Sequence, residues 1–106
     1  MSGGIIGVDL DGTLAHYDRW RGPNHIGAPV RRMRVRVVEW LAEGRDVRIF
    51  TARGEDSHPA IRAWCLKHLH RELPITNVKD RGFVEFWDDR AIQVVPNTGR
   101  RADGAE

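Results

Sequence analysis

The sequence predicts an α/β fold: a three-layer, Rossmann-like domain with a mainly parallel, five-stranded sheet. Three observations predict it. Short apolar runs rich in β-branched residues are typical of buried strands, and longer segments with apolar residues at three- and four-residue spacing are typical of helices. Strands and helices alternate along the chain, as they do in parallel sheets. The 106 residues, 41% of them hydrophobic, suffice for one core but not for two.

The first half of the chain supplies a strand, a loop and a helix. Residues 4–9 (GIIGVD) form a short apolar run that ends at a turn signal, which predicts a buried strand. Residues 14–29 mix glycine, proline, aromatic and charged residues without a period, so we expect a long loop. Across residues 30–43 apolar residues recur at helical spacing, which predicts an amphipathic helix that ends at Gly44.

The second half continues the alternation. Residues 46–51 (DVRIFT) are rich in β-branched and aromatic residues, which predicts a second strand, and a helix with Pro59 in its first turn follows. Three further runs predict strands at residues 74–78 (PITNV), 83–87 (FVEFW) and 91–95 (AIQVV). We expect residues 1–96 to form one domain and residues 97–106 to form a polar, flexible tail.

The composition excludes several classes of function. The formal net charge is only +2, so no strong field attracts nucleic acid or an anionic membrane, and the basic residues 31–36 (RRMRVR) fit a solvated helix face better than a nucleic-acid patch. Cys65 is the only cysteine, which rules out an intramolecular disulfide and a CxxC zinc or redox site. Because no apolar stretch is long enough to span a membrane, we expect a soluble, cytoplasmic protein.

Each of the first four predicted strands ends at a polar or charged residue. These residues are Asp9 and Asp11, then Thr51, then Lys79, and finally Asp88 and Asp89. Parallel strands bind ligands at their carboxyl ends, so we expect the six side chains to share one site. Carboxylates held together repel one another unless a cation lies among them, and oxygen ligands suit Mg²⁺. Mg²⁺, a hydroxyl that can donate a hydrogen bond and a lysine together predict a site that binds a phosphoryl group.

Four motifs in this order resemble those of the haloacid dehalogenase (HAD) superfamily, and most closely its small capless members. They are DLDGT at residues 9–13, FTAR at residues 50–53, Lys79 within NVKD, and FWDDRA at residues 86–91. The resemblance implies a Mg²⁺-dependent phosphatase that works through an aspartyl-phosphate. Asp9 would be the nucleophile that attacks phosphorus, and Asp11 would serve as general acid and then general base.

The same resemblance assigns the remaining groups. Thr51 would hold a phosphoryl oxygen, and Lys79 would stabilise the nucleophile and the transferring group. The ligands of Mg²⁺ would be a carboxylate oxygen of Asp9, the backbone carbonyl of Asp11, the side chain of Asp88 and, directly or through water, Asp89. On the substrate side, Gly12 would let the backbone turn beside the phosphate, with Thr13 next to it, and Arg53 would bind substrate through its guanidinium.

No segment is long enough for the cap domain that closes over the substrate in many members of this superfamily. An open site suits a large or exposed phosphorylated substrate, either a small molecule or a nucleic-acid end, or closure by a partner subunit in a homo-oligomer. The loop at residues 14–29 is the only lid that this chain itself offers. Within that loop, Arg19 and Arg21 suit a phosphate and Trp20 suits a base.

Two non-catalytic alternatives stay open. One is a binding-only protein that keeps the HAD-like motifs without turnover. The other is a receiver-like regulatory domain, which also gathers acids, a threonine and a lysine at the edge of a parallel sheet. A receiver carries its phosphoaccepting aspartate at the end of its third strand, but no aspartate directly follows residues 74–78. The order of the motifs therefore favours the hydrolase.

Overall fold

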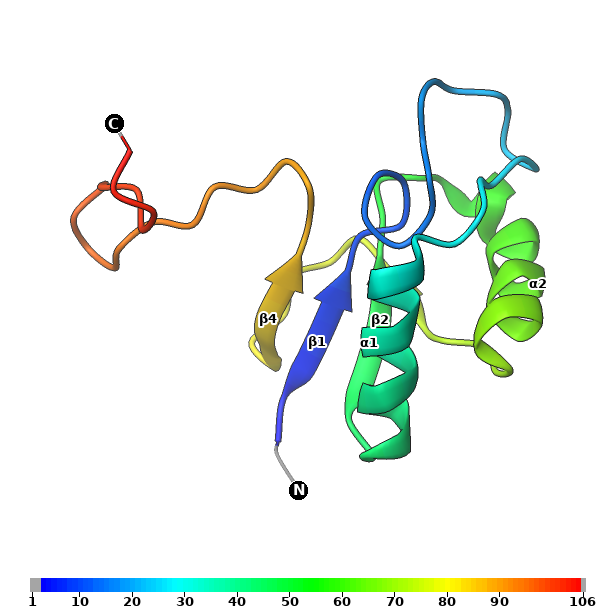
Figure 1. The fold of residues 1–106 in the computed structure, drawn as a ribbon, viewed down its shortest axis with the longest axis horizontal. Helices are drawn as coiled ribbons and strands as arrows, with labels where there is room; N and C mark the ends of the chain where they lie inside the picture. The colour runs from blue at the N-terminus through cyan, green and yellow to red at the C-terminus, as the bar shows by residue number, and fades with distance from the viewer. Residues whose placement is uncertain (1–2, 106) are drawn as a thin grey trace.

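A computed structural model describes residues 3–105 and shows an α/β fold with a four-stranded parallel sheet (Figure 1). The elements are β1 (Ile5–Val8), α1 (Arg31–Ala42), β2 (Asp46–Phe50), the short 3-10 helix η1 (Glu55–Ser57), α2 (His58–Leu69), β3 (Ile75–Thr76) and β4 (Phe83–Trp87). The predicted class, the parallel sheet and both helices are confirmed. Within residues 3–105 there is no cap domain.

The strand order β3-β2-β1-β4 decides where a site can form. The chain adds β2 and then β3 on one side of β1, whereas β4 pairs with the other side of β1. The order therefore reverses at β1, and in open parallel sheets ligands bind beside such a reversal, at the carboxyl ends of the strands. In this register Val8 at the end of β1 lies opposite Trp87 at the end of β4.

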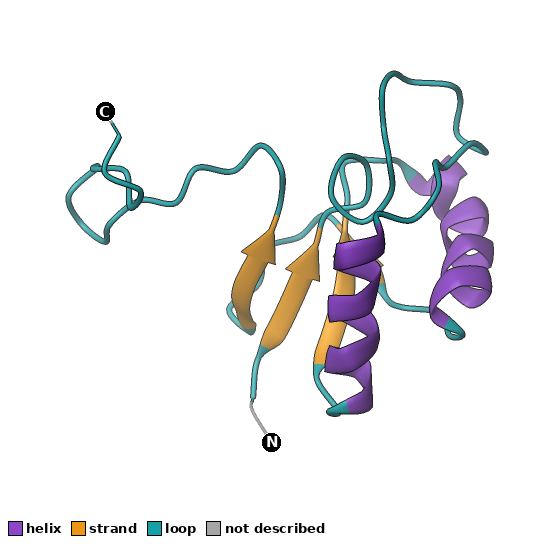
Figure 2. Cartoon of the chain, viewed as in Figure 1, coloured by secondary structure: helices purple, strands orange, loops and turns teal. Residues whose placement is uncertain are grey.

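Both helices cover the same face of the sheet, which gives two layers rather than the three that we expected (Figure 2). The helices contact each other, and the Arg34 side chain in α1 donates a hydrogen bond to the His68 carbonyl in α2 at 2.7 Å. Their apolar residues share one buried core with Ile6, Val8, Val47 and Ile49 of the sheet. The third layer does not form because residues 77–82, which connect β3 to β4, contain no helix.

The other face of the sheet carries an aromatic cluster. Phe50 of β2 packs edge-on against Phe83 and Phe86 of β4, with ring centroids 5.6 and 5.2 Å away. The rings lie close to the sheet because Gly7 in β1 has no side chain, since a Cβ there would lie 2.9 Å from the Phe83 ring. This face therefore depends on a glycine in the middle of a strand, where glycine often allows close packing.

The end of α1 and the start of α2 are as the sequence predicts. Gly44, just beyond α1, has a φ of 80°, a conformation that favours glycine. Pro59 lies in the first turn of α2, where its missing N–H costs no hydrogen bond. Between β1 and α1, residues 14–29 form the expected loop, which contains only isolated bridges.

The predicted fifth strand at residues 91–95 is wrong. This segment leaves the sheet after β4 and runs away from it (Figure 1), and its one ladder contact is a bridge between Val94 and Arg101. The composition of this segment is typical of a strand, but no neighbouring strand among the described residues pairs with it. Its side chains Ile92, Val94 and Val95 are therefore exposed. In the part of the chain that the structure describes, no helix combines the length and apolar character needed to cross a bilayer.

Candidate functional site

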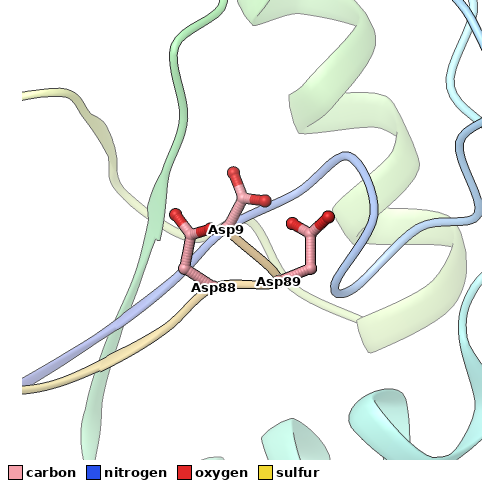
Figure 3. Close-up of side chains that lie close together, drawn as sticks. All are labelled: Asp9, Asp88 and Asp89. Atoms are coloured by element: carbon pink, nitrogen blue, oxygen red, sulfur yellow. The ribbon is translucent and has the colours of Figure 1, made fainter. Parts of the chain in front are cut away.

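Three carboxylates meet at the carboxyl ends of β1 and β4. Asp9 directly follows β1, and Asp88 and Asp89 directly follow β4 (Figure 3). One oxygen from each of the three carboxylates lies within 4.8 Å of the others, an arrangement that can hold a metal ion. The sheet places them there, because the Asp9 N–H donates to the Trp87 carbonyl at 2.9 Å and so continues the pairing of β1 with β4.

The turn after Asp9 brings its neighbours toward the same cluster. The Thr13 hydroxyl accepts a hydrogen bond from the Asp89 N–H at 3.0 Å and lies 3.2 Å from Asp89 Oδ1 and 3.4 Å from Asp9 Oδ2. Gly12 has a φ of 90°, and a Cβ there would lie 2.6 Å from Asp89 Oδ2. The sharp turn expected at Gly12 is thus confirmed, and the group that lies closest to it is the Asp89 carboxylate.

The electrostatics of the cluster favour a proton or a cation among the carboxylates. The pKa of Asp9 is raised from its ordinary value of 3.8 to about 7. Burial of the carboxyl group is the largest cause, followed by the charge of Asp88 and then by the hydrogen bond and charge of Asp89, while the hydrogen bond from Thr13 acts in the opposite direction. A divalent cation would replace the proton and relieve the same repulsion.

A cavity of about 650 Å³ lies beside the three carboxylates, at this edge of the sheet. The residues that line it are Asp9, Asp11, Tyr17, Trp20, Phe50, Thr51, Ala52, Arg53, Gly54, Asp56, Asn77, Asp88, Asp89 and Arg90. The cavity therefore unites the predicted residues after β1, β2 and β4 with two aromatic residues of the loop at 14–29. A volume of this size is typical of small-molecule sites.

Asp11 lines the cavity, but its side chain stays apart from the three other aspartates. Both of its carboxylate oxygens accept hydrogen bonds from Arg53, Oδ2 from Nε and Oδ1 from Nη2, each at 2.8 Å. The pair is shielded, because the Arg53 side chain is almost fully buried. The three aspartates predicted to bind a metal through their side chains therefore gather, while the carboxylate of Asp11, for which only the backbone carbonyl was predicted as a ligand, pairs with an arginine.

Thr51 lies where it was expected, buried at the end of β2 on the cavity wall. Its hydroxyl accepts a hydrogen bond from the Arg53 N–H at 3.1 Å, and its own N–H donates to the Thr76 carbonyl of β3 at 3.0 Å. These two bonds fix the turn that follows β2. The hydroxyl can still donate its own proton, which is what binding of a phosphoryl oxygen requires.

Lys79 does not join the other predicted residues. Its side chain is exposed, and its Nζ lies 5.2 Å from the centre of the Phe86 ring, on the face of the sheet without helices. Among the described residues Lys79 does not line the cavity. From the segment that follows β3, the residue that lines it is Asn77. Residues just after a two-residue strand are poorly fixed by the sheet, which explains why strand-end position alone does not place this side chain.

Sequence reasoning did not predict Tyr17, Asn77 and Arg90 as cavity residues. Arg90 follows the acid pair directly, so its position in FWDDRA was an available signal. Tyr17 belongs to a loop whose sequence shows no periodic pattern, so its position in space could not be predicted. For Asn77 the only sequence signal was its position in a predicted strand, near its end.

Comparison of the chain with protein-family models and with curated proteins gives no match. Its fold resembles a solved structure described as that of a conserved protein coded by a locus from Bacteroides thetaiotaomicron. The two share 24% sequence identity with a TM-score of 0.62, over 91% of this chain and 84% of that one. This likeness shows a shared fold.

Proposed function

We propose that this protein is a Mg²⁺-dependent phosphomonoester hydrolase that works through an aspartyl-phosphate, as its HAD-like motifs imply. The observation that carries the proposal is the arrangement of the four aspartates that line one cavity. Three carboxylates gather at the reversal of strand order, while Asp11 stands apart on the same wall. This is the arrangement that a metal-assisted nucleophile with a separate acid–base group requires.

The proposed reaction has two steps that reuse the same residues. A carboxylate oxygen of Asp9 attacks phosphorus while the bond to the leaving oxygen breaks, and Asp11 gives that oxygen a proton. A water molecule then attacks the phosphorus of the aspartyl-phosphate and passes a proton to Asp11, which releases inorganic phosphate and restores Asp9. In the first step Asp11 must donate a proton to the leaving oxygen. At least one of its hydrogen bonds from Arg53 must therefore open when substrate binds.

The residues present fit a magnesium ion. Asp9, Asp88 and Asp89 supply hard oxygen ligands, and burial together with the charges of Asp88 and Asp89 raises the pKa of Asp9, an effect that a bound cation would oppose. The backbone carbonyl of Asp11 would complete the set. Bound Mg²⁺ would neutralise the phosphoryl group and reduce its repulsion with the nucleophile.

Other groups would bind the phosphoryl group and shape its surroundings. Thr51 would donate its hydroxyl proton to a phosphoryl oxygen. Lys79 would reach the site after its side chain turns away from Phe86, a change that is easy for an exposed lysine. Thr13 holds Asp89 through hydrogen bonds, and Gly12 leaves room for its carboxylate. Cys65 is the only cysteine, and burial raises the pKa of its thiol to about 11, so this thiol is a poor nucleophile.

Phosphate release tests the proposal. Wild type and Asp9→Asn are given nucleotides, sugar phosphates and phosphorylated oligonucleotides, with Mg²⁺ or with EDTA. We expect release with Mg²⁺ only, and none from the variant, because the amide side chain of an asparagine cannot form the aspartyl-phosphate. Release that persists in Asp9→Asn would remove Asp9 as nucleophile.

One observation favours a binding-only protein as the second candidate. Both oxygens of Asp11 accept hydrogen bonds from the buried Arg53, so in this conformation neither oxygen is free to act on a leaving group. Binding of phosphomonoesters without phosphate release, in the assay described above, would select this alternative.

A further inference from the structure

The Arg53 guanidinium uses all of its N–H groups within the chain. Its five hydrogen bonds go to Asp11 Oδ2 and Oδ1 and to the His25 carbonyl, each at 2.8 Å, to the Pro23 carbonyl at 3.3 Å and to Ser57 Oγ at 3.4 Å. A guanidinium has five N–H donors, so a phosphate could bind Arg53 only if one of these bonds opened. The contacts make Arg53 a link between chain segments.

The segments that Arg53 links are the catalytic edge of the sheet and the loop at residues 14–29. Pro23 and His25 lie near the middle of that loop, and Asp11 lies just after β1. A second anchor comes from α2, where Trp64 Nε1 donates to the Gly27 carbonyl at 2.9 Å. The loop is therefore fastened over the cavity by two side chains, even though it contains no regular element of its own.

The fastened loop presents an aromatic ring to the cavity. The centre of the Trp20 ring lies 4.9 Å from the Arg53 guanidinium carbon, so one face of the ring stacks on the arginine. Trp20 as a residue is still 53% exposed and lines the cavity, together with the exposed Tyr17 of the same loop. In contrast, Trp64 is buried in the core, where 7% of it is exposed.

An exposed tryptophan that is held in place has a cost, because its apolar surface stays in water while its side chain is ordered. That cost is offset when a ligand covers the ring. A flat aromatic group covers it best, because offset stacking matches the shape of both partners. Asn77 and Arg90 on the same cavity wall can bind the polar edge of such a group.

We propose that Trp20 is the binding surface for a planar aromatic part of the leaving group, such as the base of a nucleoside, and that Arg53 is the positioning residue that holds this surface over the site. The inference rests on the proposed function, since it names the class of phosphomonoester that the site accepts. It assigns specificity to the loop, which takes over the selective role that a cap domain would have.

The test compares two ligands that differ only in the base. Dissociation constants of adenosine 5′-monophosphate and ribose 5-phosphate are measured by calorimetry with Mg²⁺, in an Asp9→Asn background that prevents turnover. We expect the nucleotide to bind at least about fivefold more tightly, the lower end of what stacking of one base contributes. Trp20→Ala should remove this preference, and Trp20→Phe should keep most of it.

Arg53→Lys and Arg53→Gln should reduce the preference as Trp20→Ala does, because either change releases the ring. They should also speed hydrogen exchange in residues 14–29, a readout that does not depend on activity. The control is Arg48→Gln, which removes a guanidinium that also binds an aspartate, Asp46, through Nε and Nη2 but does not line the cavity, and it should change neither result.

Three outcomes separate the two proposals. Equal affinity for both ligands, or a preference that survives Trp20→Ala, would overturn the role of Trp20 and leave the phosphate site standing. A preference that is lost in Trp20→Ala but unchanged in both Arg53 variants would overturn the positioning role. Failure of the Asp9→Asn protein to bind either ligand, together with no phosphate release from either ligand by the wild type, would count against the phosphate site and hence against both proposals. If the wild type does release phosphate, the same preference is read from its KM values.

Discussion

Asp9 combines two properties that are in tension: it is partly buried, and it faces two other carboxylates. Its raised pKa of about 7 is the consequence. Between its ordinary pKa of 3.8 and this raised value, the folded protein keeps a proton on Asp9 that the unfolded chain has lost. The stability that this proton contributes is therefore fully present below the ordinary pKa and is lost as the pH rises through about 7.

The metal-free protein should accordingly melt at lower temperatures as the pH rises across this window, and Asp9→Asn should not share this decline. Calorimetry in EDTA, with wild type and variant at matched pH values, isolates the contribution of Asp9 as the difference between their melting temperatures. Mg²⁺ should restore the wild type above about pH 7, since the ion binds the deprotonated cluster. A difference between wild type and variant that stays flat with pH would contradict this explanation.

Individual residues also show where sequence reasoning stops. Asp9, Asp88 and Asp89 were predictable, because strand-end position and the pairing of parallel strands bring them together. The five hydrogen bonds of Arg53 were not, because two of its acceptors are carbonyls in an irregular loop. A guanidinium after a strand predicts a phosphate ligand and a structural link equally well, and only the fold shows that the link is made.

Among the elements, the turn after β1 constrains the site most tightly. Gly12 and Gly22 have similar positive φ values, 90° and 98°, but their surroundings differ. A Cβ at Gly12 would meet the Asp89 carboxylate, whereas a Cβ at Gly22 would meet nothing within 4 Å. Substitutions at these two glycines therefore separate the effect of backbone strain from the effect of displacing the Asp89 carboxylate.

Both Gly12→Ala and Gly22→Ala should lower the free energy of unfolding by about 1–3 kcal/mol, the usual cost of this backbone conformation in a residue with a side chain. Only Gly12→Ala should also weaken Mg²⁺ binding, because it displaces Asp89. Urea unfolding and Mg²⁺ titration of both variants check this. Equal Mg²⁺ affinity in the two would show that the contact with Asp89 has no role in metal binding.

Elements that carry a strong local pattern were predicted well. Both helices have an apolar stripe and recognisable ends, and β1, β2 and β4 are compact apolar runs. β3 is shorter than expected, and residues 91–95 form no strand, because a strand exists only where a neighbour supplies hydrogen bonds. Composition indicates that a segment can be a strand, but the neighbour depends on the whole topology.

For the whole molecule, the reversal of strand order at β1 explains why the three carboxylates lie together at the carboxyl ends of the strands. It makes β1 and β4 neighbours, although they are far apart in sequence, and so joins the first motif to the last. The alternation of strands and helices predicted this edge. It did not predict that one face of the sheet lacks helices, because that depends on a short connection between β3 and β4.

The central claim is that Asp9 becomes phosphorylated during Mg²⁺-dependent hydrolysis. The most direct measurement is mass spectrometry of the intact protein, quenched in acid during reaction with a phosphomonoester that it hydrolyses, with the modified peptide then sequenced. We predict one added phosphoryl group on Asp9 when Mg²⁺ is present, and none with EDTA or in Asp9→Asn. Turnover with no phosphoryl group on the protein, or with the group on another residue, would contradict the account.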